Sequence, residues 1–272
     1  MSLITITTGI ACGGMATARR VAETLGMVLY DDDRLHKEAV EMGFSSEDMK
    51  SFDQTAPRLL TRLLKLRPPE YLDLMAAAVY EVARRGEGII CGNGAPYFLR
   101  DFGCALHLRI HASETFRIGR LMEQEKINDE DAMKLIEKGD SDMEGFMQFS
   151  FQMDWNDISL YDVIINVDKI GLDSAAAQVI AMAKTRQNQE CSLTALETME
   201  KLSLLKRVEA SILKNNIHPQ ELFFEVPETG VVKITGLINP LHTVGDVLEI
   251  VRAVPGVKDV ICEAERHPLG DI

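Results

Sequence analysis

No apolar stretch in the 272-residue sequence approaches the roughly 20 residues that a membrane-spanning helix requires. Basic residues are also few, because 29 Lys and Arg stand against 42 Asp and Glu and leave a net charge of −13. A polyanion favours a basic surface, so this balance argues against nucleic-acid binding. The start of the sequence lacks the charged, apolar and small-residue segments of a secretory signal. We therefore expect a cytoplasmic protein with no transmembrane segment and no nucleic-acid partner.

Cysteine is scarce as well. The five cysteines include no C-x-x-C pair, so the sequence indicates neither a zinc nor a redox motif, and no metal site is predicted. Cys91, Cys104 and Cys262 lie in apolar runs and are expected to be small buried side chains. Cys12 lies in a glycine-rich turn, where helix amides would lower a thiol pKa. Its simpler interpretation is a small residue that fills a tight loop.

The clearest motif joins a strand-like run to a helical one near the start of the sequence. The apolar residues 3–6 are followed by Gly9, Gly13 and Gly14, and then by an amphipathic segment with helical spacing. This order matches a Walker A loop, G-x-x-x-x-G-K-[ST], whose backbone amides bind phosphate at a helix N-terminus. The motif predicts an anion-binding turn, and a plain tight turn without a ligand is the alternative.

Two side chains of that motif are missing. Met15 and Ala16 stand where Lys and Ser or Thr belong; the Lys normally reaches the β- and γ-phosphates, and the hydroxyl holds Mg²⁺. Arg117 and Arg120 are spaced to share one helix face, where they would contact a phosphate or pair with nearby glutamates. The predicted phosphate- or nucleotide-binding residues are Gly9, Cys12, Gly13, Gly14, Met15, Ala16, Arg117 and Arg120.

Strand-like and helical patterns alternate over residues 1–185. Short, nearly continuous apolar runs predict strands at residues 3–7, 27–30, 88–92, 104–110 and 163–167. Helical patterns cover residues 15–25, 68–85, 113–125, 129–138 and 174–184, with Ser113 and Asn128 as N-caps. This alternation predicts an α/β fold of the P-loop NTPase type, with a parallel sheet covered by helices on both faces.

The last third of the sequence has another rhythm. A polar stretch at residues 186–199 predicts a linker, so the predicted domains are residues 1–185 and 200–272. Residues 203–215 and 243–253 have helical patterns, and residues 223–226, 231–235 and 259–263 have strand patterns. The order α-β-β-α-β predicts a small α/β sandwich.

Residues 1–185 resemble the cytidylate kinase-like family of P-loop proteins. The segments that carry the resemblance are the loop and first helix (8–18), Leu-Gly-Met-Val-Leu-Tyr-Asp (25–31), Cys-Gly-Asn-Gly-Ala-Pro-Tyr-Phe-Leu-Arg (91–100), Phe-Arg-Ile-Gly-Arg-Leu-Met (116–122) and Tyr-Asp-Val-Ile-Ile-Asn (161–166). The resemblance implies a fold that transfers a phosphoryl group from ATP, with Mg²⁺ as cofactor, to a nucleoside monophosphate.

The departures from that family fall on its charged positions. Met15 replaces the basic residue of the loop, and Asn93 stands where the family has Arg. Residues 138–149 match a lid that ordinarily carries Arg, but here they offer Asp140, Asp142 and Glu144. A single Arg at the transition state can be worth about 10³–10⁵ in rate. The sequence therefore predicts impaired phosphoryl transfer.

Several residues are predicted on the acceptor side of this site. Asp31, Asp32 and Asp33 follow a strand end; they read as a solvated loop or cap, or as ligands for Mg²⁺ or a ribose hydroxyl. The predicted acceptor-side residues are Asp31, Arg58, Arg62 and Asn93. An exposed helix face is the alternative for Arg58 and Arg62.

Residues 204–265 resemble the BON domain. The resemblance rests on Val-Lys-Ile-Thr-Gly-Leu-Ile (232–238) and on the segment 251–260, which ends in Gly-Val-Lys-Asp-Val. It implies a small binding module with a protein or lipid partner. The segment has no basic cluster, which gives anionic lipid little support. The sequence leaves a homodimer open.

Three hypotheses on function result. The first is nucleotide or phosphate-ligand binding by a degenerate kinase-like domain with a regulatory role. The second is an active, CMP-type nucleoside monophosphate kinase in which the loop backbone, Arg117 and Arg120, with Arg19 or Arg20 as a further candidate, take the place of the missing cations. The third is a protein-interaction scaffold that binds no nucleotide.

Overall fold

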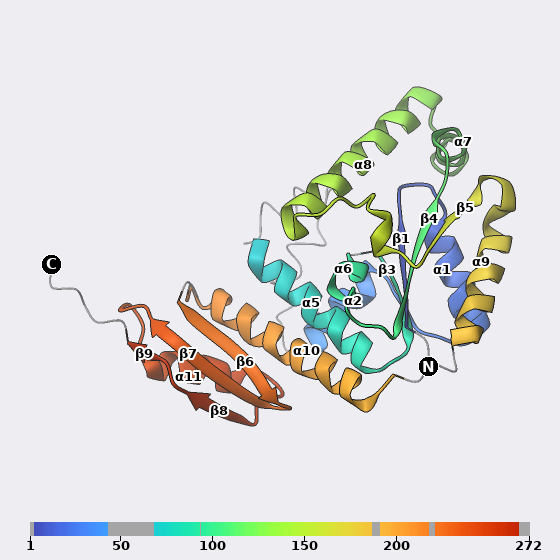
Figure 1. Ribbon diagram of the computed structural model, residues 1–272. Helices are drawn as coiled ribbons and strands as arrows, with labels where there is room; N and C mark the ends of the chain where they lie inside the picture. Colours follow the sequence, from blue (N-terminus) through green and yellow to red (C-terminus); the bar gives the residue numbers. More distant parts are fainter. Residues whose placement is uncertain (1–2, 43–67, 93, 187–190, 218–220, 267–272) are drawn as a thin grey trace. The chain divides into compact units, whose positions relative to one another are not determined.

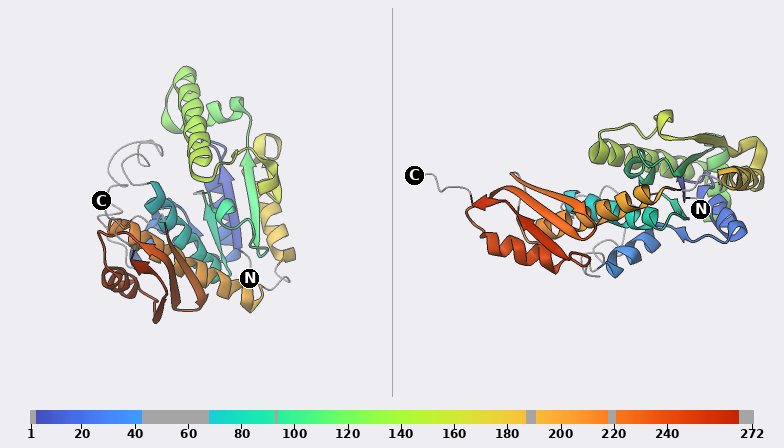
Figure 2. Two further views of the ribbon diagram at one scale, coloured as in Figure 1. Left: turned by 60° about the vertical axis from the view of Figure 1, so that its left-hand side comes forward. Right: turned by 60° about the horizontal axis from the view of Figure 1, so that its bottom comes forward.

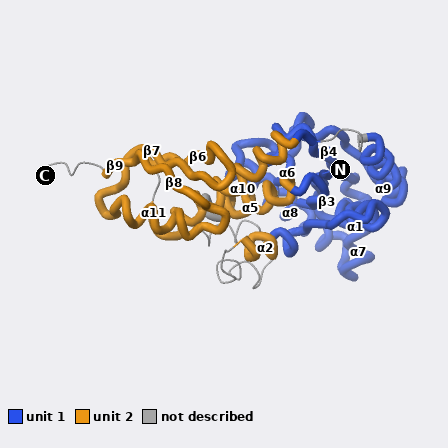
Figure 3. Tube along the Cα trace, turned by 90° about the horizontal axis from the view of Figure 1, so that it is seen from below, with its two compact units in different colours: residues 1–35, 54–62, 85–192 blue, residues 36–53, 63–84, 193–272 orange. Residues whose placement is uncertain are grey.

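The computed structural model describes residues 3–42, 68–92, 94–186, 191–217 and 221–266 (Figure 1). The chain divides into two compact units (Figure 3), which we describe one at a time. Unit 1 comprises residues 1–35, 54–62 and 85–192, and unit 2 comprises residues 36–53, 63–84 and 193–272. Unit 2 therefore takes in segments from the first third of the chain. The division into residues 1–185, 186–199 and 200–272 stays a prediction.

Unit 1 is built on a five-stranded parallel sheet, which confirms the predicted α/β fold. Its strands lie in the order β2-β3-β1-β4-β5. They are β1 (Leu3–Thr8), β2 (Leu29–Tyr30), β3 (Gly88–Cys91), β4 (Ala105–His111) and β5 (Val163–Asn166). All five run in one direction, so their carboxyl ends meet at a single edge of the sheet.

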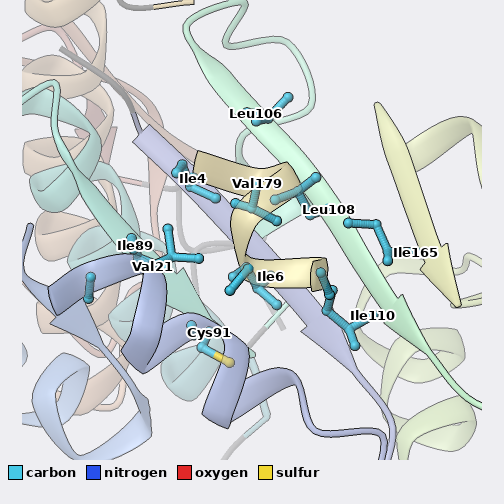
Figure 4. Packing of buried hydrophobic residues seen from close by; sticks show 14 of the residues in the cluster. Ile4, Ile6, Val21, Ile89, Cys91, Leu106, Leu108, Ile110, Ile165 and Val179 are labelled. Carbon is cyan, nitrogen blue, oxygen red and sulfur yellow. The ribbon is translucent and has the colours of Figure 1, made fainter. Parts of the chain in front are cut away.

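The unit 1 core lies between this sheet and two helices. α1 (Gly14–Leu25) and α9 (Val167–Arg186) pack side by side on one face of the sheet (Figure 1). Figure 4 shows Val21 of α1 and Val179 of α9 against Ile6 of β1, all fully buried. Continuous apolar runs such as Ile89-Ile90-Cys91 of β3 are typical of strands in parallel sheets that are covered by helices.

Two helices lie at the carboxyl ends of the strands (Figure 2): α7 (Glu114–Glu125) and α8 (Asp129–Phe151). The predicted caps are confirmed, because the side chains of Ser113 and Asn128 accept hydrogen bonds from backbone N–H groups of the first turns. The prediction that this second helix ends near residue 138 is wrong. Residues 138–151 contain no proline, and Phe146 and Met147 are buried, so the helix continues until Gln152 adopts a left-handed conformation.

Two shorter helices complete the described part of this edge, and a single 3₁₀ turn, η1 (Ile158–Leu160), precedes β5. α6 (Ala95–Phe98) follows β3, and α2 (Asp32–Glu41) follows β2. The acidic run after β2 is a helix start, because Asp31 accepts a hydrogen bond from the Arg34 N–H and Asp32 and Asp33 form the first turn. Acidic side chains at this end of a helix interact favourably with its dipole.

In unit 2, α5 (Pro68–Arg84) packs along α10 (Leu193–Lys214). The Ser203 hydroxyl donates to the Ala77 carbonyl at 3.1 Å, and Lys206 Nζ lies 2.9 Å from Asp73 Oδ1. Burial raises the pKa of Asp73 to about 6, although Lys206 opposes that shift. α10 begins ten residues earlier than the helix predicted at 203–215, because Met199 and Ser203 are buried in this packing.

The rest of unit 2 is a small mixed sheet with one helix. Its strands are β6 (Leu222–Glu228), β7 (Val231–Ile238), β8 (Asp259–Cys262) and β9 (Glu265–Arg266). β7 pairs antiparallel with β6 and parallel with β8 and β9. α11 (Val244–Ala253) starts with a capping box between Thr243 and Asp246. Val208 of α10, Ile234 of β7 and Val251 of α11 share one buried core, which confirms the predicted small α/β layer.

In the described ranges, no helix is both long enough and apolar enough to cross a membrane.

Candidate phosphate-binding loop and adjoining pocket

The glycine-rich loop joins the carboxyl end of β1 to the start of α1. Gly13 is the N-cap of α1 and has a φ of 87°, a left-handed conformation that favours glycine. A Cβ on Gly14 would collide with the side chain of Thr8. The helix has neither a side-chain cap nor an acidic residue in its first turn. No acidic side chain of the first turn therefore lies beside the first N–H groups of α1. A helix start without such a side chain favours the binding of an anion.

Arg117 holds this loop from the side of α7. Its Nε donates to the Ile10 carbonyl at 2.7 Å, and its two terminal nitrogens donate to the two carboxylate oxygens of Asp140 at 2.7 Å each. Burial lowers the pKa of this guanidinium, but the hydrogen bonds to Asp140, together with the charges of Cys12, Asp140 and Glu114, outweigh burial and raise the pKa. Its ion-pair partner lies on α8, whereas the sequence-based alternative was a glutamate of its own helix. The charge of Arg117 is therefore largely compensated within the protein.

α8 also approaches the loop directly. A Cβ on Gly139 would overlap the side chain of Ile10, so glycine at this position allows the close contact. Ile10 and Asp140 thus connect the loop to one turn of α8 through an apolar contact and an ion pair.

Arg120, one turn after Arg117, differs in its environment. Its Nη1 lies 3.2 Å from the position that a Cβ on Gly13 would occupy, and its guanidinium carbon lies 5.8 Å from the centre of the Phe116 ring. The Arg120 Nε is buried and has no hydrogen-bond partner. Among the described residues, no carboxylate forms an ion pair with this guanidinium. Arg120 is consequently the positive charge beside the loop that is best placed to meet an anion.

Thr17 and Arg20 do not replace the two missing side chains of the loop. Met15 is half-buried and packs against the core, and Ala16 is exposed. Thr17 carries the next hydroxyl, but it is buried and donates to the Gly13 carbonyl at 3.1 Å. Arg20 pairs with Asp173 at an exposed position, so it does not serve the loop. Burial raises the pKa of the Cys12 thiol, with Arg117 opposing this, which fits a residue that fills space.

A pocket of about 370 Å³ adjoins the loop. It is lined by Thr8, Met15, Asp31, Asp32, Asp33, Cys91, Gly92, Met143 and Phe146. These described lining residues include three carboxylates and no lysine or arginine. The pKa of the Cys91 thiol reflects this acidic environment. Burial raises that pKa to about 12, and the charges of Asp32 and Asp31 add to the rise, while Arg19 opposes it.

Aromatic contacts fix the end of α8 near this pocket. The Phe151 ring stacks on Tyr97 at 4.8 Å between ring centres and meets Phe98 edge-on at 5.1 Å. A Cβ on Gly94 would lie only 2.9 Å from the Phe151 ring. Phe146 and Trp155 are also buried, whereas Phe149 is 61% exposed.

The structure thus brings together most of the predicted site. The loop residues and both arginines meet at one point, and Asp31 lies at the neighbouring pocket. Arg58, Arg62 and Asn93 fall outside the described residues. Sequence reasoning missed the pairing of Asp140 with Arg117 and the contribution of Met143 and Phe146 to the pocket. The i, i+3 spacing of those two apolar residues on a helix was the available signal.

Comparisons with known proteins agree on the fold of this part of the chain. A family model described as the Cytidylate kinase-like family matches residues 3–169. An uncharacterized protein from Eubacterium ventriosum has a similar solved structure, with 21% identity, a TM-score of 0.54, and coverage of 68% of this chain and 100% of that one. Shikimate kinase from Bacteroides thetaiotaomicron (16% identity, TM-score 0.41, coverage 67% and 98%) and a gluconokinase from Sinorhizobium meliloti (14%, 0.42, 70% and 98%) are also similar. None of the curated proteins matches the sequence.

Proposed function

Because the chain belongs to the cytidylate kinase-like family, we propose that residues 3–169 bind a nucleotide or another phosphate ligand at the glycine-rich loop without efficient phosphoryl transfer. The observation that supports this is a contrast within the loop. Its backbone keeps an anion-binding form, whereas Met15 and Ala16 replace the side chains that act on phosphate and Mg²⁺. Ligand binding rather than turnover would then carry a regulatory signal.

The proposed binding of an anion at the loop rests on two independent features of the described residues. The start of α1 has no side-chain cap, and its dipole favours a negative group. Arg120 lies against Gly13 with a buried Nε that has no hydrogen-bond partner. A phosphate oxygen placed between them would accept hydrogen bonds from backbone N–H groups and from a guanidinium, both of which suit phosphate.

The residues of the loop fit Mg²⁺ poorly. Ala16 offers no hydroxyl, and the hydroxyl of Thr17 is already used within the loop. Over the described ranges, no three His, Cys, Asp or Glu side chains are grouped so that they could hold a metal ion. The resemblance to the family implies ATP with Mg²⁺. The proposed binding, however, depends on hydrogen-bond donors of the protein and requires no metal ion.

The pocket beside the loop suits a different part of the ligand. Its carboxylates accept hydrogen bonds from hydroxyl groups such as those of a ribose, and Met143 and Phe146 offer apolar surface to a ring. The predicted acceptor-side residues Asp31, Arg58, Arg62 and Asn93 belong to this part of the proposal.

Unit 2 enters the proposal as a binding module. Its order α10, β6, β7, α11, β8 follows the α-β-β-α-β pattern behind the proposed likeness to the BON domain. We propose a protein or lipid partner for it, a cytoplasmic location for the whole chain, and a homodimer as a state to test. Neither unit then needs catalytic turnover to act.

Isothermal titration of the full-length protein with ATP and Mg²⁺, and then with CMP, tests the proposed function. We expect ATP to bind in the micromolar range and expect no ADP when both nucleotides are mixed with the protein. ADP production would establish the active kinase instead. The absence of heat with ATP, CMP and inorganic phosphate alike would favour the interaction scaffold.

A further inference from the structure

A disulfide joins two cysteines of unit 1 that are 87 residues apart in the sequence, Cys104 and Cys191. Their Cα atoms lie 5.6 Å apart, within the usual range for a bridged pair. The prediction that Cys104 is a buried apolar residue is therefore wrong. Both bridged residues are partly exposed, whereas the free cysteines Cys12 and Cys91 are buried.

The bond lies far from the loop along the strands of the sheet. Cys104 directly precedes β4, and Ala105 at the start of β4 pairs with Leu3 at the start of β1. Cys104 therefore lies at the amino edge of the parallel sheet, while the glycine-rich loop follows the carboxyl end of β1. Neither cysteine is among the described residues that line the pocket or hold the loop.

Cys191 lies in the short segment between α9 and α10. α9 ends at Arg186 and α10 begins at Leu193, so six sequence positions, 187–192, separate the two helices. When Cys191 is joined to Cys104, only Ser192 lies between a residue fixed on unit 1 and the first residue of α10. The bond thus joins a residue two positions before α10 to the residue that precedes β4.

We propose that Cys104 and Cys191 form a reversible thiol–disulfide switch that ties the residues just before α10 to the amino edge of the unit 1 sheet. Partial exposure lets a small thiol or disulfide reach both sulfurs, which reversible exchange requires. In the cytoplasmic location proposed above, disulfides are transient and often redox-sensing. Neither cysteine belongs to the loop or to the pocket lining, so the switch stands or falls independently of nucleotide binding.

The oxidant that balances this step is a small disulfide such as oxidised glutathione. One cysteine thiolate attacks a glutathione sulfur, forms a mixed disulfide and releases one glutathione. The second cysteine thiolate then attacks the protein sulfur of that mixed disulfide and displaces the second glutathione. The two protein thiols lose two electrons and two protons, and one oxidised glutathione becomes two reduced ones.

The test counts free thiols in the folded, full-length protein. One sample is equilibrated with oxidised glutathione and one with dithiothreitol; both are acid-quenched, alkylated in denaturant and weighed by mass spectrometry. We expect alkylation of all five cysteines after dithiothreitol and of three after glutathione, with a non-reduced peptide that links Cys104 to Cys191. Alkylation of five cysteines after glutathione, glutathione adducts without a link, or a link that native-state reduction does not break would each overturn the proposal.

Three variants sharpen this count. Cys104→Ser and Cys191→Ser should each abolish the mass difference that is due to the link. Cys262→Ser, the matched change at a free and partly exposed cysteine, should retain it. A cross-link closing so long a loop restricts the unfolded chain, so we also expect the oxidised wild type to melt several degrees above the reduced form. Cys104→Ser should melt alike under both conditions, and a wild type that does so would contradict the switch.

Discussion

The glycine-rich loop and the pocket beside it lie at the same edge of the unit 1 sheet and have opposite electrostatic character. The loop offers an uncapped helix start and Arg120, while the pocket presents Asp31, Asp32 and Asp33. Phosphoryl transfer requires positive charge around the moving group on both the donor and acceptor sides. The described residues that line the pocket include no lysine or arginine. This contrast supports the proposed function, in which the site holds a phosphate at the loop and disfavours a second phosphate at the pocket.

Adding a methyl group at Gly14 of the loop should have the largest effect on ligand binding. In Gly14→Ala the new methyl group would collide with Thr8, so the loop must shift and ATP binding should be lost. Such a clash should also cost about 1–3 kcal/mol of stability. Titration calorimetry and urea unfolding measure the two effects.

Gly119→Ala is the matched control for this change, because Gly119 is also helical and has nothing within 4 Å of a new Cβ. Replacing a helical glycine with alanine should stabilise the protein by up to about 1 kcal/mol and leave ATP affinity unchanged. Normal ATP binding by Gly14→Ala would show that the loop is not the binding site.

Restoration of the two missing side chains of the loop should have the next largest effect on ATP affinity. Met15→Lys with Ala16→Ser places a cation and a hydroxyl where Walker A loops have them, and one new charge-assisted hydrogen bond gives about a tenfold gain in affinity for ATP with Mg²⁺. Met133→Lys adds the same charge at an exposed position on α8 and controls for net charge. Equal affinities in the double variant and the wild type would count against a nucleotide at the loop.

Much of unit 1 could be predicted from the sequence because its strands are short apolar runs between amphipathic segments. The run at residues 88–92 is β3, and Ser113 caps the helix that it was expected to cap. The length of α8 could not be predicted. Residues 138–149 match a lid in the family and have no strong periodicity, and they are helical because tertiary contacts bury Phe146 and Met147.

The candidate site could be predicted only where it is continuous in the sequence. The loop is a single segment, so its glycines and the substitutions at Met15 and Ala16 were evident. The partner of Arg117 was not, because Asp140 lies 23 residues away on the next helix and the interhelical angle decides whether they meet. The bond between Cys104 and Cys191 escaped prediction for the same reason, since no local spacing connects the two residues.

Loss of the uncompensated cation should weaken binding moderately. Arg120→Met keeps most of the apolar packing on Phe116 and removes the charge beside Gly13. A partly exposed charge-assisted contact is worth about 1 kcal/mol, so affinity for inorganic phosphate and ATP should fall about fivefold. Arg100→Met, at an exposed arginine after α6, should leave both affinities unchanged. Equal affinities in Arg120→Met and wild type would remove Arg120 from the site.

The smallest expected effect tests the compensated arginine and runs in the opposite direction. Asp140→Asn removes the carboxylate that neutralises Arg117, so the loop regains net positive charge. A neighbouring unit charge is worth on the order of 0.5–1 kcal/mol in water-like surroundings, which corresponds to a gain of about two- to fivefold in phosphate affinity. The loss of one of the two acceptor oxygens and of the carboxylate charge should lower stability by about 1–3 kcal/mol in the same variant.

Glu144→Gln separates this effect from general charge, because it removes a carboxylate one turn further along α8 at an exposed position and leaves the Arg117 pair intact. If both variants gained affinity equally, the acidity of α8 would set the anion affinity, and the pairing would matter only for stability. If Asp140→Asn instead lost affinity, the hold of Arg117 on the Ile10 carbonyl would outweigh its charge. The compensated arginine would then act on ligands through the shape of the loop, and Arg120 alone would carry the electrostatic part of the contrast between loop and pocket.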